Sequence, residues 1–233
     1  MRLEADEGVS SVYPFSIPAV AALRAGLALD AAVTFLVGEN GSGKSTLVEA
    51  IAAAAGFNPE GGSRNFAFAT RESTSQLHEH LRLVRDARRP ATGYFLRAES
   101  FFNVATEVER LDVGEGYGPR SLHEQSHGES FLSLALHRFG ADGLYLMDEP
   151  EAALSPQGCV SLLRRIHDLV CDGGQFVIAT HSPLLIGYPH ATVYELSAHG
   201  IEQVRYAETS TFGLFEAFLA APERFVQRLL EDP

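Results

Sequence analysis

The stretch Val33-Thr-Phe-Leu-Val37, followed by Gly38-Glu-Asn-Gly-Ser-Gly-Lys44-Ser45, decides the fold of this chain. Its first five residues are apolar or β-branched, which is typical of a buried parallel strand. The next eight have the spacing GxxxxGK[ST] of a phosphate-binding loop. Residues 45–55 are rich in helix formers and stop at Gly56. A strand, a glycine loop and a helix in this order predict a phosphate site at the N-terminus of the helix.

Lys44 is the one lysine among the 18 lysine and arginine residues of the sequence. Its ammonium is a compact point charge, whereas guanidinium is a planar fork. Chance would place a last surviving lysine anywhere, but Lys44 occupies the position that meets the β- and γ-phosphates of a nucleotide. The alternative is a glycine-rich turn without a ligand. The candidate nucleotide-binding residues here are Gly38, Glu39, Asn40, Gly41, Ser42, Gly43, Lys44, Ser45 and Thr46.

Length and composition predict a single α/β domain over residues 1–233, with 45% hydrophobic residues available for its core. A net charge of −12 argues against broad electrostatic binding of nucleic acid or of anionic membranes. Cys159 and Cys171 match no metal or redox spacing. Because no apolar run has the length of a membrane span and the first residues are acidic, we expect a cytoplasmic protein without direct membrane insertion.

Two further strands are expected to end in chemically useful side chains. The apolar run 144–147 leads into Asp148-Glu149, and the run 175–179 leads into Thr180-His181. Parallel strands end at one edge of a sheet, so these groups should lie beside the phosphate loop. Asp148 and Ser45 would hold Mg²⁺, and Glu149 would polarise the attacking water. On its own each run could be an ordinary strand ending in a polar turn.

Other elements follow from periodicity and turn residues. We expect amphipathic helices where apolar residues recur every three or four positions, and a hairpin where two short apolar runs flank Gly200. The predicted helices cover residues 76–89, 129–139, 156–170 and 212–230, and the predicted strands include 94–96, 193–196 and 201–204.

The order of these motifs resembles that of the ATP-binding cassette (ABC) ATPases over nearly the whole chain. The resemblance rests on the phosphate loop, on residues 125–129 and 144–149, on 152–155, and on His181. The chain is also similar to small stand-alone bacterial ATPases of the predicted AAA type, which share residues 95–103 and 125–129. The family implies an α/β P-loop NTPase fold with a mostly parallel sheet, a small antiparallel β part and a helical signature subdomain. That subdomain would cover approximately residues 57–140.

The resemblance also implies roles for individual residues. Lys44, Glu149 and His181 would be the catalytic residues, with His181 sensing the γ-phosphate. The signature segment would clamp the γ-phosphate of ATP held by a second subunit, through Ser126, His127, Gly128 and Glu129. The spacing of Ser126 and Glu129 equally fits a capping box at a helix N-terminus.

The chain departs from the family at two places. His127 stands where the family has a glycine, and no glutamine ends the strand 94–96. Glu99 is the nearest candidate for that position, where it would be a third Mg²⁺ ligand. Tyr13 and Phe15 are the candidate aromatics for stacking on adenine, with core packing as the alternative.

We therefore expect a Mg²⁺-dependent ATP hydrolase that closes into a homodimer around two ATP molecules, with a further protein partner left open. Alternatives are the nucleotide-binding subunit of a membrane transporter, an SMC- or repair-like head acting on nucleic acid, and a nucleotide-gated module with slow hydrolysis. The nucleic-acid alternative would depend on one face of the predicted helix 76–89, formed by Arg82, Arg85, Arg88 and Arg89. The acidic net charge favours a solvated face instead.

Overall fold

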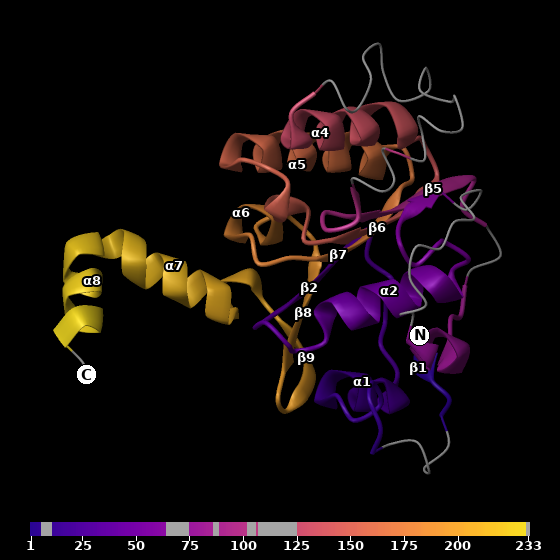
Figure 1. Ribbon diagram of the computed structural model, residues 1–233, viewed down its shortest axis with the longest axis horizontal. Coiled ribbons are helices and arrows are strands. Elements are labelled where there is room, and N and C mark those ends of the chain that lie inside the picture. The colour runs from indigo at the N-terminus through magenta and orange to yellow at the C-terminus, as the bar shows by residue number, and fades with distance from the viewer. Residues whose placement is uncertain (6–10, 64–74, 86–88, 102–105, 107–124, 232–233) are drawn as a thin grey trace.

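A seven-stranded sheet forms the centre of the computed structural model, which describes residues 1–5, 11–63, 75–85, 89–101, 106 and 125–231 (Figure 1). The five inner strands run parallel, and the two edge strands are antiparallel to their neighbours. The order across the sheet is β3 (Gly62–Ser63), β5 (Thr92–Arg97), β6 (Gly143–Asp148), β7 (Gln175–Ala179), β2 (Val33–Gly38), β8 (Thr192–Ser197) and β9 (Gly200–Val204).

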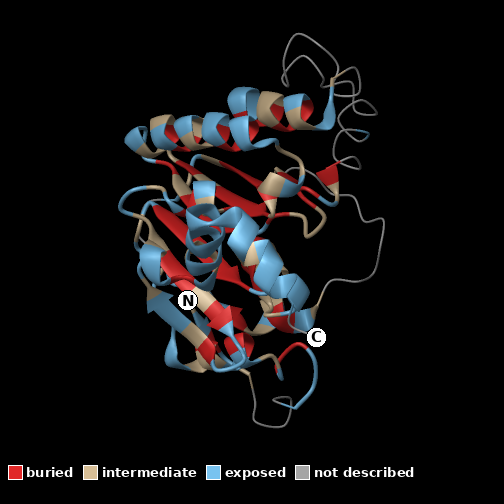
Figure 2. Ribbon diagram, turned by 90° about the vertical axis from the view of Figure 1, so that its left-hand side faces the viewer, coloured by how far each residue is buried: buried red, intermediate tan, exposed pale blue. Residues whose placement is uncertain are grey.

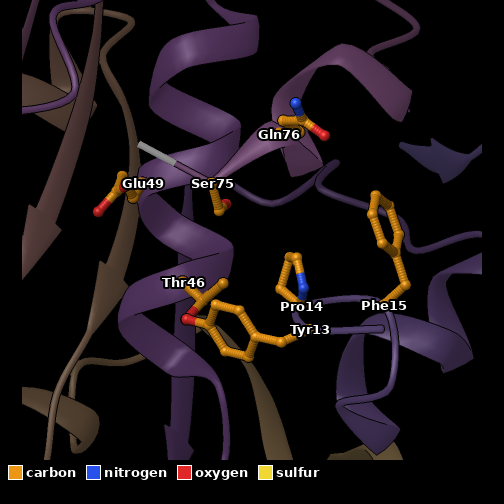
Figure 3. A pocket seen from close by; sticks show the side chains of 7 residues that line it. All are labelled: Tyr13, Pro14, Phe15, Thr46, Glu49, Ser75 and Gln76. Carbon is orange, nitrogen blue, oxygen red and sulfur yellow. The ribbon is translucent and has the colours of Figure 1, made fainter. Parts of the chain in front are cut away.

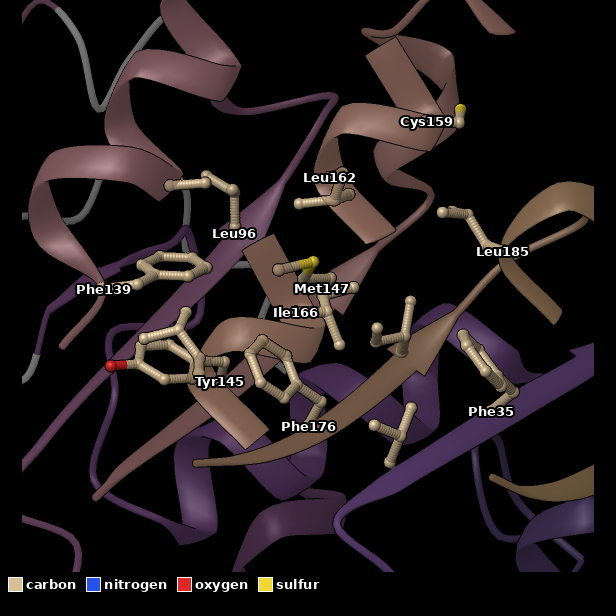
Figure 4. Packing of buried hydrophobic residues seen from close by; sticks show 14 of the residues in the cluster. Phe35, Leu96, Phe139, Tyr145, Met147, Cys159, Leu162, Ile166, Phe176 and Leu185 are labelled. Carbon is tan, nitrogen blue, oxygen red and sulfur yellow. The ribbon is translucent and has the colours of Figure 1, made fainter. Parts of the chain in front are cut away.

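Helices cover both faces of this sheet, so the strands lie buried between two layers (Figure 2). Alternate residues of one strand enter different cores, as Phe35 and Leu36 of β2 do. This two-sided burial explains why the strands are continuously apolar. One face packs on α4 (His127–Arg138), α5 (Pro156–Cys171) and α6 (Pro183–Ile186), through the side chains shown in Figure 4. The other packs on α1 (Pro18–Ala22), the short 3-10 helix η2 (Leu23–Ala25) and α2 (Lys44–Ala54).

The prediction of a helix over residues 76–89 is wrong. A 3-10 helix, η3 (Gln76–His80), is followed at once by the short strand β4 (Leu81–Arg82). Strand β4 pairs antiparallel with β1 (Arg2–Leu3), so Leu81 reaches the core through a sheet contact. The helical spacing of Leu77 and Leu81 was therefore misleading, because pairing with a strand far away in the sequence overrides local propensity.

The other predicted elements are present with small shifts in their ends. The predicted C-terminal helix is divided into α7 (Ser210–Ala220) and α8 (Pro222–Glu231), because Pro222 offers no N–H and disfavours a helical conformation at Ala221. Two further 3-10 helices are η6 (Pro150–Ala152) and η7 (Tyr206–Glu208). Residues 112–120, whose glycines predict a flexible turn, lie outside the described residues. The subdomain boundaries 57–140 stay a prediction, although β3 and β5 belong to the main sheet.

Gly93 allows β5 to approach β6 closely. A Cβ atom there would lie 2.6 Å from the carbonyl oxygen of Leu144 and 2.7 Å from Cζ of Phe57. We expect Gly93→Ala to lower the free energy of unfolding in urea by about 1–3 kcal/mol, the usual cost of overpacking. Gly213→Ala is the control, because its Cβ would meet no atom within 4 Å and alanine is the better helix former. Equal stability of Gly93→Ala and the wild type would contradict the strand packing.

Candidate functional site

The glycine loop crosses the carboxyl edge of the sheet between two close neighbours. Gly38 has φ 142° and Gly43 has φ 97°, both in the region that favours glycine. A side chain on Gly38 would collide with the carbonyl oxygen of Leu196, and a Cβ on Gly43 would lie 2.8 Å from Cγ2 of Ile17. The loop therefore needs glycine at these two positions for its shape and for its packing.

Helix α2 starts directly after the loop and has no side-chain cap. Gly43 is its N-cap residue, and the first helical bond runs from the amide of Leu47 to the carbonyl of Gly43, at 2.9 Å. An uncapped N-terminus leaves backbone N–H groups available, and the helix dipole favours an anion there. Together these features give the local geometry and polarity that an anion needs, which agrees with the phosphate site predicted from the sequence.

Lys44 folds back over its own loop. Its Nζ atom donates hydrogen bonds to the carbonyl oxygens of Gly38, at 2.9 Å, and of Glu39, at 3.0 Å. The side chain is buried, and this burial lowers the pKa of Lys44, although the carboxylates of Glu149 and Asp148 oppose the shift. The ammonium is thus held at the loop by carbonyl groups, with acidic side chains close by.

Asp148 ends β6 as a buried carboxyl group. Burial raises its pKa to about 6, while the nearby Arg97 guanidinium and the Ser45 hydroxyl act in the opposite direction. Arg97 Nε lies 3.4 Å from Oδ2 of Asp148. Among the described residues, Oδ1 is buried and has no hydrogen-bond partner. An orphaned carboxylate oxygen beside Ser45 suits a hard cation such as Mg²⁺, which takes one or two carboxylates and completes its shell with phosphate and water oxygens.

Arg97 is the site residue that sequence reasoning missed. Besides Asp148 it contacts Glu49 of α2, at 2.9 Å, and Glu99, at 3.4 Å. Glu99, the predicted third metal ligand, has a side chain that is 86% exposed and pairs with Arg97. The sequence could have indicated this residue, because Arg97 directly follows the predicted strand 94–96. If that strand lies parallel to the strand that ends at Asp148, Arg97 and Asp148 become neighbours, as they are in the structure.

Glu149 and His181 come together as the sequence predicts. Oε1 of Glu149 lies 3.6 Å from Nε2 of His181. The backbone of Glu149 is left-handed, with φ 49° and ψ 53°, which is costly for a residue other than glycine. Its amide donates to the carbonyl of Ala179, and the amide of His181 donates to the carboxylate of Glu151. The two strand ends therefore hold both side chains by their backbones.

The N-terminus of α4 forms a capping box, which the sequence predicts as the alternative to a phosphate clamp. The amide and the hydroxyl of Ser126 both donate to Oε2 of Glu129, at 2.9 and 2.7 Å, and the amide of Glu129 bonds back to the Ser126 hydroxyl. Gly128 fits closely against the segment after Glu149, because a Cβ there would lie 3.0 Å from the carbonyl oxygen of Ala153. The helix start is thereby tied to the acidic strand end.

Cavities flank the phosphate loop on three sides. One of about 540 Å³ holds the acidic groups, and His127 reaches it too; it is lined by Ser45, Ala98, Glu99, His127, Asp148, Glu149 and Ala152. A second, also about 540 Å³, borders residues 38–42 and Ser210. A third, of about 270 Å³, lies beside Thr46 and Tyr13 (Figure 3). The cavities therefore border residues 38–42 of the loop and Ser45 and Thr46 after it.

The two aromatic candidates for adenine stacking differ in exposure. Phe15 is a core residue and is 5% exposed. Tyr13 is 66% exposed, and its hydroxyl lies 3.4 Å from Oγ1 of Thr46 on α2 (Figure 3). Tyr13 alone can offer a free ring face to a ligand at the loop.

The arginine face expected for nucleic acid is not formed as predicted, because its helix is absent. Arg82 pairs with Glu4 at 3.2 Å, and Arg85 donates to the carbonyl of Ala54 at 3.0 Å. Arg88 lies outside the described residues. Within the described part of the chain, no helix is long and apolar enough to cross a membrane, and no three or more His, Cys, Asp or Glu side chains cluster as a metal site.

The pKa of Asp148 predicts how the stability of the nucleotide-free protein depends on pH. Since the folded pKa is raised from 3.8 to about 6, the folded state loses stability as pH rises between these values. Asp148→Asn removes this loss, so we expect its free energy of unfolding at pH 7.5 to exceed the wild type's by about 1–3 kcal/mol. Urea unfolding in the presence of a chelator measures this. The gain should shrink at pH 4.5 and be absent in Asp168→Asn, and a less stable Asp148→Asn protein at pH 7.5 would contradict the assignment.

Sequence comparisons give two overlapping family matches. A model described as "AAA domain" matches residues 25–109, and one described as "AAA domain, putative AbiEii toxin, Type IV TA system" matches residues 97–187. The cytochrome c biogenesis ATP-binding export protein CcmA of Rhodopseudomonas palustris is 29% identical in strain HaA2 and 27% in strain BisB5. Each alignment spans 158 residues, which is 64% of this chain and 78% of the relative.

Solved structures resemble the chain more remotely. The cbiO1 structure from Clostridium perfringens, described as part of the ABC transporter complex cbiONQ, is 16% identical with a TM-score of 0.45 and covers 88% of this chain and 90% of its own. The SMC head domain from Thermotoga maritima is 15% identical with a TM-score of 0.42, and the match covers 74% of this chain and 89% of the SMC chain. The phosphate loop, the strand ends around it, the two family models and the CcmA relatives support an ABC-type P-loop ATPase.

Proposed function

We propose that this protein binds and hydrolyses Mg²⁺–ATP and closes into a homodimer around two ATP molecules. The observation that carries the proposal is the convergence of Lys44, Asp148, Glu149 and His181 at one sheet edge, with Glu149 held in a left-handed backbone 3.6 Å from His181. Strained backbone of this kind is characteristic of functional positions.

Each residue has a chemical role in the proposed reaction. The amides at the start of α2 and the Lys44 ammonium bind the β- and γ-phosphates. Ser45 and the free Oδ1 of Asp148 would hold Mg²⁺, which neutralises charge on the phosphates when bound. Glu149 accepts a proton from the attacking water as general base, and His181 orients Glu149.

The nucleoside end of ATP is proposed to lie along the first turn of α2. There the exposed ring of Tyr13 borders the cavity that also contains Thr46 and Glu49. An aromatic face at this position can stack on adenine, as aromatic side chains do on bases generally. Phe15 is excluded from that role by its burial.

The signature segment is proposed to act on the nucleotide of a second copy. His127 borders the cavity that contains Glu149. Gly128 packs against Ala153, in the segment that follows Glu149. The start of α4 thus lies on the same edge as the phosphate loop, where a second copy could meet it. In that role Ser126 would have to release the hydroxyl bond that it donates to Glu129.

A transporter subunit is the second candidate function. The observation that favours it is the name of the CcmA relatives, which are ATP-binding export proteins. Co-purification with a membrane permease would support this candidate, and full ATPase activity of the isolated chain without such a partner would count against it.

Replacing Lys44 by arginine tests the phosphate site. Lys44 is 4% exposed and its ammonium fits between two carbonyls of the loop, so the wider guanidinium cannot take the same place. We expect Lys44→Arg to weaken ATP binding by about tenfold or more in calorimetric titration. Arg164→Lys, an exposed change in the opposite direction, should leave the affinity unchanged. Wild-type affinity in Lys44→Arg would remove the basis of the assignment.

Replacing Glu149 by glutamine tests catalysis and closure separately. The amide keeps the size of the side chain but cannot accept a proton, so turnover should fall by a factor of about 10²–10⁴. ATP affinity should stay near wild type, and Mg²⁺–ATP should lower the dimer dissociation constant in sedimentation over a dilution series. Glu202→Gln, on the exposed strand β9, serves as the matched control. A dimer dissociation constant of Glu149→Gln that ATP leaves unchanged would exclude the composite site.

A further inference from the structure

The two C-terminal helices form an arm that stands away from the body of the molecule (Figure 1). None of the residues in α7 or α8 is buried. The base of the arm is nevertheless fixed. Thr209 is buried and caps α7, the hydroxyl of Ser210 donates to Glu195 at 2.6 Å, and the rings of Tyr206 and Phe212 are 4.9 Å apart. The direction of the arm is therefore set by the body.

Most of the arm is exposed (Figure 2), and many of its exposed residues are apolar. Of the 13 exposed large hydrophobic residues in the described part of the chain, seven lie on it: Leu214, Phe215, Phe218, Leu219, Val226, Leu229 and Leu230. The other six are spread over separate elements of the body: Val12, Tyr13, Val84, Leu136, Val160 and Leu184. Short helices are marginal in water without packing, and a contiguous apolar surface of this kind marks an interaction site.

The charges on the arm indicate which partners fit. Residues 210–231 carry three carboxylates and two guanidinium groups, at Glu216, Glu223, Glu231, Arg224 and Arg228. Nucleic acid and anionic bilayers both require an excess of basic groups. An apolar protein surface is therefore the partner that the arm fits.

The apolar pattern is the same in both helices. Leu214, Phe215, Phe218 and Leu219 have the spacing i, i+1, i+4, i+5 in α7, and residues 225, 226, 229 and 230 repeat that spacing in α8. The two stripes touch within the arm, where the rings of Phe218 and Phe225 lie 5.7 Å apart, and their other side chains form an exposed surface of the width that helices bury against one another. Since no comparable stripe is exposed elsewhere in the described residues, the best match for the arm in this chain is the same arm in another copy.

The arm also leaves the body at the edge that carries the nucleotide site. Ser210, the first residue of α7, lines the cavity bordered by Gly38 and Ser42 of the phosphate loop. A second copy that docks on the nucleotide edge would meet the arm. A two-fold interface uses the same surface patch on both copies, so the stripes of α7 and α8 in one copy would contact the same stripes in the other.

We propose that α7 and α8 pack against α7 and α8 of a second copy, and that this contact holds a dimer together in the absence of nucleotide. The placement of the second copy at the nucleotide edge rests on the proposed function, whereas the contact between the arms does not need ATP. The arms would then keep two half-sites close together between rounds of ATP binding.

The test is sedimentation velocity of the nucleotide-free protein over a dilution series. We expect the wild type to dimerise and the double variant Leu219→Glu/Leu229→Glu to raise the dimer dissociation constant by about a hundredfold. Both side chains are exposed, at 68% and 65%, so the body should keep its fold and its melting temperature. Val84→Glu is the matched control, because Val84 is 79% exposed on the body, and it should dimerise like the wild type.

A cross-linking experiment locates the contact. Leu230→Cys in a Cys171→Ser background should form an intermolecular disulfide on oxidation, since Cys159 is buried, and Val84→Cys in the same background should not. A wild type that stays monomeric, or one that partitions to vesicles instead, would overturn the proposal. So would a double variant that dimerises normally. ATP titration of the same proteins distinguishes the two proposals. A double variant that loses the nucleotide-free dimer but keeps wild-type ATP affinity would support the contact between the arms and leave the proposed nucleotide site unaffected.

Discussion

Ala179 pairs with Asp148 on one side and with Leu36 on the other, and Asp148 in turn pairs with Arg97. This row of paired residues brings four parallel strands to an end at one edge of the sheet. The glycine loop, the two acids and His181 all follow from it. A register shift of one residue would turn Asp148 toward the opposite face, because side chains alternate along a strand. Strand pairing therefore positions the site, and the side chains supply its chemistry.

The charged groups at this edge of the sheet lower the stability of the folded protein. Burial raises the pKa of Asp148, lowers that of Lys44 and raises that of Glu49. Each shift means that the folded protein disfavours the charged form of that side chain. Arg97 offsets part of this cost by bridging Asp148 and Glu49. The left-handed backbone of Glu149 adds to it. Such a cluster would not persist for structural reasons alone, which supports a functional reading.

The body and the arm differ in how far their apolar residues are buried. In the body both faces of the sheet are covered: Phe176 is fully buried on one face (Figure 4) and Leu146 on the other. In the arm the apolar stripes of α7 and α8 are left uncovered within one chain. The contrast divides the molecule into a body whose apolar residues are buried within one chain and an arm whose apolar side chains stay exposed.

The sequence by itself determined the phosphate loop with its strand and helix, the acids after β6 and the histidine after β7. These are local patterns, in which a few adjacent residues dictate both conformation and chemistry. Only the tertiary structure decided that Leu81 lies in a strand, that Phe15 is core while Tyr13 is free, and that Arg97 bridges Asp148 and Glu49. These outcomes depend on partners distant in the chain, and spacing along a sequence does not record which strand will lie beside which.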